Sequence, residues 1–235
     1  MTTTAIAALE SSILIESVLE IDGAKVSGAR GSVFGPLHAS SSAPITVVLG
    51  NRGSGRTSLL LAAAGRMRID KGTVRVFGID ANTSAGELRR LTGIAGFDAI
   101  DLLESEATVA EAVRERFTWI APWYRRVQHL RPEDVSRILQ PVFGQMVIPE
   151  ARSLVRDMTE AQKLLVRIAL ALLESPRMVL VDDLDEVKDP RERAAVADRL
   201  TALAQSGTFF VVGSADERDL NLFSPESRAV VTLGR

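Results

Sequence analysis

The stretch Pro44–Leu60, PITVVLGNRGSGRTSLL, decides the fold. Its first part, Ile45–Leu49, is a short apolar run rich in β-branched residues, which predicts a buried strand. A glycine-rich loop follows, and an apolar helical stretch begins at Ser58. Strand, glycine loop and helix form the context that a phosphate-binding P-loop requires. Glycines let backbone amides curl around a phosphate with no Cβ in the way, and the helix N-terminus adds partial positive charge.

The loop meets the pattern G-x-x-x-x-G-K-[ST] at every fixed position except one, where Arg56 stands in place of lysine. Lysine is a slim point charge, whereas arginine is a bulkier planar fork, so the exchange is not conservative. Two interpretations stay open, because Arg56 either neutralises bound phosphate or fills the site. A third is that the stretch is a glycine-rich turn that binds nothing.

A second motif supplies the other half of such a site. Met178–Val181 is an apolar run that predicts a buried strand, and Asp182 and Asp183 follow it directly. A P-loop needs a carboxylate from a neighbouring strand to hold Mg²⁺ together with the hydroxyl of the loop. We expect Thr57 to bind the metal directly and Asp182 to reach it through water, with Asp183 placed to position an attacking water. Acids also commonly end strands. However, the glycine loop and this strand occur together in one chain, which favours a nucleotide-binding role for both.

Composition excludes several classes of protein. The chain has 235 residues with 46% hydrophobic and 25% charged content, which is ordinary for a globular protein. A net charge of −2 gives no basic field for nucleic acid, so we expect no nucleic-acid partner. The absence of cysteine excludes disulfides and thiolate metal sites. The N-terminal stretch is a poor secretory signal and no apolar run is long enough for a membrane span, which predicts a cytoplasmic protein.

The order of predicted elements indicates an α/β protein. Strands are expected at 13–21, 31–37, 45–49, 73–77, 92–97, 178–181, 208–213 and 229–233, with turns at Asp22–Gly23 and Ser27–Gly28. Helical spacing dominates from 108 to about 174 and returns at 191–205. We therefore expect a single domain over 1–235, with a nucleotide-binding core formed by 13–98 and 171–235 and a helical insertion at 99–170.

With these motifs in this order, the chain resembles the nucleotide-binding domain of ABC-type ATPases from about Ile13 to its end. Gly50–Thr57 corresponds to the Walker A loop, and Thr108–Glu111 resembles the start of the family's helical subdomain. Met158–Gln162 occupies the place of the LSGGQ signature, and the run to Asp183 follows it in register. The resemblance implies a P-loop NTPase fold, with a RecA-like core, N-terminal antiparallel β-strands and an inserted helical subdomain.

The resemblance also implies ligands and partners. The ligands are ATP and Mg²⁺, with Thr57 and Asp182 on the metal and Asp182 and Asp183 as catalytic acids. The expected partners are an integral membrane permease-like subunit and a second ABC-type subunit, in a homodimer or a heterodimer. The chain would then sit peripherally on the inner face of the cell membrane. The implied nucleotide-binding residues are Gly50, Asn51, Arg52, Gly53, Ser54, Gly55, Arg56, Thr57, Ser58, Thr159 and Gln162.

Departures from the family pattern concern catalysis. Arg56 replaces the Walker A lysine, Asp183 stands at the catalytic glutamate position, and Ala215 stands at the switch histidine position. Phe97 or Asp98 takes the place of the Q-loop glutamine. Glu160 and Ala161 replace the two signature glycines, and in this family the signature faces the γ-phosphate of the partner subunit, so a glutamate there brings like charge to a phosphate.

Together these departures predict an ATP-binding subunit with weak or no hydrolysis, because phosphoryl transfer depends on positioning and electrostatics. Two alternatives remain open: a non-hydrolytic scaffold or regulatory module that controls a membrane partner, and a slow but true ATPase.

One further stretch, 118–124 (TWIAPWY), holds both tryptophans and the only tyrosine, and Arg125 and Arg126 follow it. It is interpreted either as the core of the helical part with a solvated basic end or as a docking surface for a membrane partner, because aromatic residues and arginine are enriched at interfaces.

Overall fold

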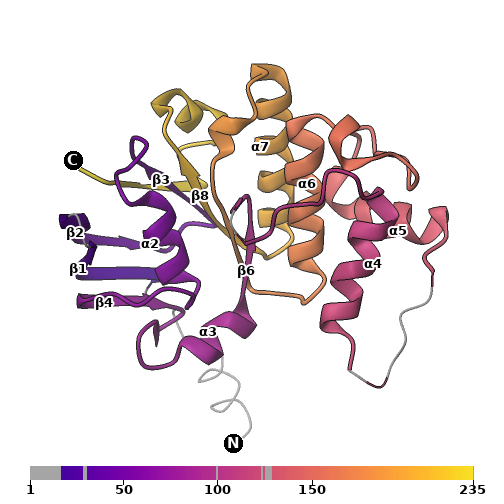
Figure 1. Cartoon of the computed structure of the whole chain (residues 1–235). Helices are drawn as coiled ribbons and strands as arrows, with labels where there is room; N and C mark the ends of the chain where they lie inside the picture. Colours follow the sequence, from indigo (N-terminus) through magenta and orange to yellow (C-terminus); the bar gives the residue numbers. More distant parts are fainter. Residues whose placement is uncertain (1–16, 29–30, 99, 123, 125–128, 235) are drawn as a thin grey trace, which may run out of the picture.

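The computed structural model describes residues 17–28, 31–98, 100–122, 124 and 129–234. An antiparallel sheet holds the first strands of the chain, in the order β2 (Gly31–Ser41), β1 (Leu19–Gly28), β4 (Lys71–Val76) and β5 (Ile79–Asp80). Figure 1 shows β1, β2 and β4 of this sheet at the left of the molecule, in indigo to purple.

The first strand differs from its expected boundaries. Residues 13–16 of the expected strand lie outside the described residues, and β1 begins at Leu19. The expected turn at Asp22–Gly23 is wrong, because β1 continues through it. Instead, the pairing register shifts between Ile21 and Ala24, and Gly23 has a φ of 59°. A β-bulge therefore uses the conformational freedom of this glycine without ending the strand.

The second sheet is parallel throughout and carries the site. Its order is β6 (Thr92–Ala95), β7 (Met178–Val181), β8 (Phe209–Ser214), β3 (Ile45–Leu49) and β9 (Arg228–Thr232). The sequence predicted each of these strands to within a few residues. Because the strands are parallel, the loops after β3, β7 and β8 leave the sheet at the same edge.

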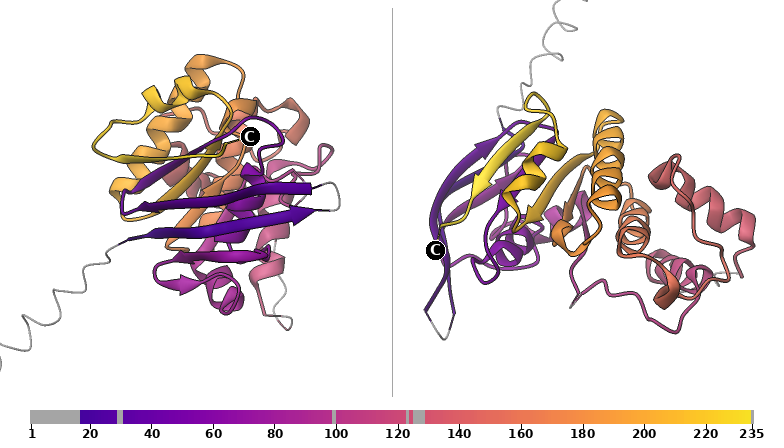
Figure 2. Two further views of the ribbon diagram at one scale, coloured as in Figure 1. Left: turned by 90° about the vertical axis from the view of Figure 1, so that its left-hand side faces the viewer. Right: turned by 90° about the horizontal axis from the view of Figure 1, so that it is seen from above.

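Helices cover both faces of the parallel sheet (Figures 1 and 2). Helix α2 (Arg56–Ala63) lies between the two sheets and contacts β2, β4 and β8, and α3 (Ala85–Leu91) precedes β6. On the other face, α6 (Glu160–Leu172) packs on β6 and β7, and α7 (Pro190–Gln205) packs on β8. Helices α4 (Val109–Ile120) and α5 (Pro132–Phe143) lie beyond α6, and short 3₁₀ turns span Val155–Asp157, Leu184–Glu186 and Glu217–Leu222.

Two hydrophobic cores follow from this layering. Ile45, Val47 and Leu49 of β3 join the core formed with α4 to α7, whereas Val48 joins the core formed with α2 and the antiparallel sheet. Successive side chains of a strand point to opposite faces, so a central parallel strand such as β3 is buried on both faces. The sequence prediction of an α/β fold is confirmed. Among the described residues, we find no helix whose length and hydropathy would let it span a bilayer.

The core beside α6 gives a stability prediction. The side chain of Leu165 is 0% exposed, so Leu165→Ala leaves a cavity and should lower the free energy of unfolding by about 2–5 kcal/mol. Urea denaturation followed by circular dichroism measures the change. Val147, which is 78% exposed, provides the control, because Val147→Ala should change the stability by less than about 0.5 kcal/mol.

Candidate functional site

The glycine-rich loop connects the end of β3 to the start of α2. Gly53 and Gly55 have φ values of 83° and 87°, and a Cβ at Gly55 would lie 2.6 Å from the carbonyl oxygen of Val33. Gly55 is also the N-cap of α2 and has no side chain to cap the helix. The first amides of a helix lack partners within the helix. The loop therefore has the glycines and the helix start that a phosphate-binding site requires.

The side chain of Arg56 is turned into the protein, where it is 6% exposed. Its Nε lies 3.3 Å from Oδ1 of Asp182, and its Nη1 donates to the carbonyl oxygen of Gly50 at 2.7 Å. Its Nη2 is ion-paired with Asp183 and lies 3.7 Å from Oδ1 of Asp185. The guanidinium thus joins the loop after β3 to the acids after β7. The geometry places the guanidinium beside these acids, and its role at a bound phosphate stays a prediction.

Asp183 occupies a crowded electrostatic position. It follows the buried Asp182 in the left-handed conformation, with a φ of 52°, and its amide donates to Oδ1 of Asp182 at 3.0 Å. Burial and the neighbouring charge of Asp182 raise the pKa of Asp183, and the charge of Arg56 opposes that rise. An acid committed to a guanidinium in this way is poorly placed to activate a water molecule.

Strand β8 provides the space for this cluster. A Cβ at Gly213 would lie 2.7 Å from Oδ1 of Asp182 and 3.1 Å from Cδ of Arg56. Because Gly213 has no Cβ, the side chains of Asp182 and Arg56 can pack directly against β8. Two residues further on, the amide of Ala215 donates to Oδ1 of Asp185 at 3.0 Å, at the position where the resemblance expected a switch histidine.

The remaining loop residues are placed as follows. Oγ of Ser54 is buried and has no hydrogen-bond partner among the described residues. Thr57 is exposed and Ser58 is half-buried in the first turn of α2. The amide of Gly50 donates to Ser214, and the carbonyl of Asn51 accepts from the amide of Ser54 at 3.0 Å. Arg52 forms an exposed ion pair with Glu186, which is a second link between this loop and the segment after β7.

Two residues of the signature segment form hydrogen bonds to each other. Thr159 is the N-cap of α6, its Oγ1 accepts from the amide of Gln162, and Oε1 of Gln162 accepts from the amide of Thr159. Glu160 pairs with Lys163 at 2.9 Å and lines a cavity of about 90 Å³ together with Asp182 and Asp183. The structure therefore places Glu160 near the acids of the site. It gives Thr159 and Gln162 hydrogen bonds to each other.

Sequence reasoning missed two contributors. Asp185 stands three residues after Asp182, and the cluster of acids after β7 was the available signal. The other is Asp101, which accepts from the amides of Gly96 and Phe97 at 2.9 and 2.6 Å and pairs with Arg167 at 2.6 Å. This pair fixes the segment at which the Q-loop glutamine was expected, and Asp98 also pairs with Arg167.

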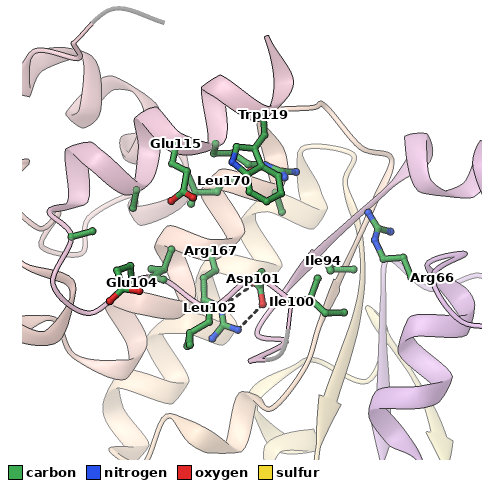
Figure 3. A pocket seen from close by; sticks show the side chains of 15 residues that line it. Arg66, Ile94, Ile100, Asp101, Leu102, Glu104, Glu115, Trp119, Arg167 and Leu170 are labelled. Carbon is green, nitrogen blue, oxygen red and sulfur yellow. Dashed lines mark hydrogen bonds and ion pairs between the residues drawn. The ribbon is translucent and has the colours of Figure 1, made fainter. Parts of the chain in front are cut away.

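A groove of about 330 Å³ lies between α4, α6 and the segment after β6. Figure 3 shows Trp119, Leu170, Ile100 and Leu102 around it, with Arg167 and Asp101 paired below. Trp119 is 75% exposed, so its interpretation as part of the helical core is wrong. Trp123, Arg125 and Arg126 lie outside the described residues.

Comparison with known proteins identifies the family of the chain. A model of the ABC transporter family matches residues 40–185, more than half of the chain. The chain belongs to this family. The family binds ATP with Mg²⁺, and the P-loop NTPase fold expected from the sequence is confirmed.

Relatives in the family include import proteins and a drug-resistance protein. A phosphonates import ATP-binding protein of Nitratidesulfovibrio vulgaris is 24% identical over 68% of this chain and 62% of its own length. A daunorubicin/doxorubicin resistance ATP-binding protein of Streptomyces peucetius is 25% identical over 86% of this chain and 56% of its own. The chain thus spans less than two thirds of these relatives. A probable anion import ATP-binding protein of Haloferax volcanii is 30% identical over 81% of this chain and 68% of its own.

Solved structures share the fold. A dimeric ATP-binding cassette in a post-hydrolysis state with ADP and phosphate superposes with a TM-score of 0.70 and 17% identity, over 92% of this chain and 97% of the other. The cbiO1 protein of Clostridium perfringens, part of the ABC transporter complex cbiONQ, has a TM-score of 0.67 and 16% identity, over 92% and 84% of the two chains.

The acids do not fit Mg²⁺ in the arrangement found here. Thr57 and Asp182 offer the oxygen donors that Mg²⁺ prefers. However, Oδ1 of Asp182 already accepts from Arg56 and from the amide of Asp183, and a metal there would lie close to the guanidinium charge, which repels it. The metal-binding role of Thr57 and Asp182 stays a prediction.

The close approach at Gly213 gives a testable consequence. Gly213→Ala should force Asp182 and Arg56 apart and lower the stability by about 1–3 kcal/mol, the usual cost of overpacking. Thermal unfolding of the purified protein measures the loss. Gly86 in α3 is the matched control, because its added Cβ would meet only Arg89 at 3.9 Å, and Gly86→Ala should leave the stability unchanged or raise it. Equal melting temperatures for wild type and Gly213→Ala would contradict the packing described here.

Proposed function

We propose that this chain is the nucleotide-binding subunit of an ABC transporter-like membrane complex, and that it binds ATP with weak or no hydrolysis of its own. The observation that carries the proposal is the buried guanidinium of Arg56, which is paired with Asp182 and Asp183. The loop 50–58 supplies backbone amides for the phosphates. The acid that would have to position water is held by an arginine.

The signature segment supports the same conclusion for a dimer. We expect it to face the nucleotide of a second ABC-type subunit, whether an identical or a different chain. Glu160 brings a negative charge to that surface, and the hydrogen bonds between Thr159 and Gln162 occupy the amides of both residues. A site completed by this segment would attract a triphosphate less strongly than one completed by glycines.

The groove beside Trp119 supports a membrane partner. Its exposed apolar side chains include Ile100 and Leu102 from the segment after β6. Large exposed apolar side chains gathered in a hollow are typical of interaction sites. We propose that a permease-like subunit docks here and holds the chain at the inner face of the membrane. The helical part at 99–170 would then transmit motion between partner and nucleotide.

The acid cluster also favours a second candidate, a regulatory module that binds nucleotide and never hydrolyses it. The two candidates differ in turnover, which is slow or absent in the first and always absent in the second. Calorimetry with Mg-ATP and a phosphate-release assay on the same sample should give binding with very slow release. Turnover at about 1 s⁻¹ or faster, ordinary for an enzyme, would contradict both.

A restoration series tests the cause of the slow turnover. Arg56→Lys, Asp183→Glu and Ala215→His together return the family's residues, and they should raise phosphate release by about 10²-fold or more, the usual effect of a well-placed acid–base group. Adding Asp182→Asn to the same variant is the control, and it should remove the gain. If the triple variant binds ATP and gains no rate, Arg56 and Asp183 are not what limits hydrolysis.

The docking groove is tested by sedimentation with membranes of the source cells. Trp119→Ala should weaken the association by about fivefold or more, since a central tryptophan commonly contributes over 1 kcal/mol to binding. Val147→Ala, which removes an exposed apolar side chain elsewhere, should leave it unchanged. Equal sedimentation of the Trp119 variant and wild type would place the membrane contact on another surface.

A further inference from the structure

The acids after β7 form a cage around one cation, the guanidinium of Arg56. Asp182, Asp183 and Asp185 all lie within 4.0 Å of the guanidinium of Arg56, and Asp182 is 1% exposed. The fourth contact is the carbonyl oxygen of Gly50, in the loop itself. A guanidinium has five N–H donors in a fixed fork, so it satisfies several oxygens at once. The cage leaves the cation buried and held from several sides.

The loop remains open on its outer side while the guanidinium is held inside. Asn51, Arg52, Gly53 and Thr57 are exposed, and a Cβ at Gly53 would meet no atom within 4 Å. A phosphate can therefore reach the loop and the start of α2 without displacing the side chain of Arg56.

A divalent metal in a P-loop site lies between the acid and the phosphates and offsets their mutual repulsion. Here a positive charge already lies against the acids, at the end of the loop that takes the phosphates. We infer that Arg56 is the resident cation of this site, so that the chain binds the phosphates of a nucleoside di- or triphosphate without a divalent metal. This inference rests on the proposed nucleotide-binding function.

Arg56→Lys separates this role from simple positive charge. A lysine ammonium is a compact charge with three donors and no fork. It cannot hold Asp182, Asp183 and the Gly50 carbonyl in the same geometry. The freed carboxylates would repel phosphates in the absence of a metal, and they would offer a metal the oxygen ligands that the arginine now occupies. The variant should therefore require Mg²⁺ where the wild type does not.

The experiment is a calorimetric titration of the full chain with ADP and with ATP, once in excess EDTA and once in excess MgCl₂. For the wild type, we expect the two dissociation constants to agree within about threefold. For Arg56→Lys, we expect Mg²⁺ to tighten binding by about tenfold or more. AMP serves as the ligand control, because it lacks the diphosphate that the loop would hold.

Arg75→Lys is the matched control for the exchange of arginine for lysine. Arg75 lies on the antiparallel sheet and pairs with Glu20 at 4.0 Å, so this variant should behave as the wild type in both titrations. Circular dichroism checks that each variant is folded. If Arg56→Lys does not fold, the wild-type comparison still decides, and Asp185→Asn provides a second perturbation of the cage that should alter the affinity in EDTA more than the affinity in Mg²⁺.

The outcomes are distinguishable. Binding by the wild type only in the presence of Mg²⁺ overturns this inference and leaves nucleotide binding intact. An Arg56→Lys variant that remains independent of Mg²⁺ also overturns it, because the guanidinium would then not be what replaces the metal. No binding of ADP or ATP in either condition, even at millimolar nucleotide, would refute the proposed function and this inference together.

Discussion

The site depends on one buried contact, the guanidinium of Arg56 against the carboxylates that follow β7. Both Arg56 and Asp182 are almost fully buried, and isolated charges are not stable in a protein interior unless they are paired and hydrogen-bonded. Removing one member of such a pair typically costs about 3–5 kcal/mol, because the other charge stays buried without compensation. The arginine thus connects the glycine-rich loop after β3 to the acids after β7.

The parallel sheet makes this contact possible. Strands β3 and β7 flank β8, so the loop after β3 and the acids after β7 leave the same edge with only one strand between them. Gly213 in that central strand has no side chain and leaves room for the pair to form. In this way, a residue that takes no part in binding decides whether the arginine can reach the acids.

The other departures from the family pattern also change the groups expected around the phosphates. An ATPase of this family concentrates positive groups and amides around the phosphates, with one acid free to direct water. Here Asp183 is ion-paired with Arg56, the carboxylate of Glu160 at the start of α6 pairs with Lys163, and Ala215 offers only its backbone amide. The proposed function, nucleotide binding with little or no hydrolysis, rests on these contacts.

The sequence alone determined the local elements, because strands, glycine turns and helices leave a pattern within a few residues. The strands Ile45–Leu49 and Met178–Val181 were predicted in this way. The glycine loop and the order of the family motifs were also evident from the sequence. It could not determine the bulge at Gly23, the exposure of Trp119 or the partners of Arg56. Each of these depends on strands and helices that lie far apart in the chain. Whether Arg56 would face a phosphate or the acids was decided by which charges the sheet placed within its reach, and only the tertiary structure placed Asp182, Asp183 and Asp185 there.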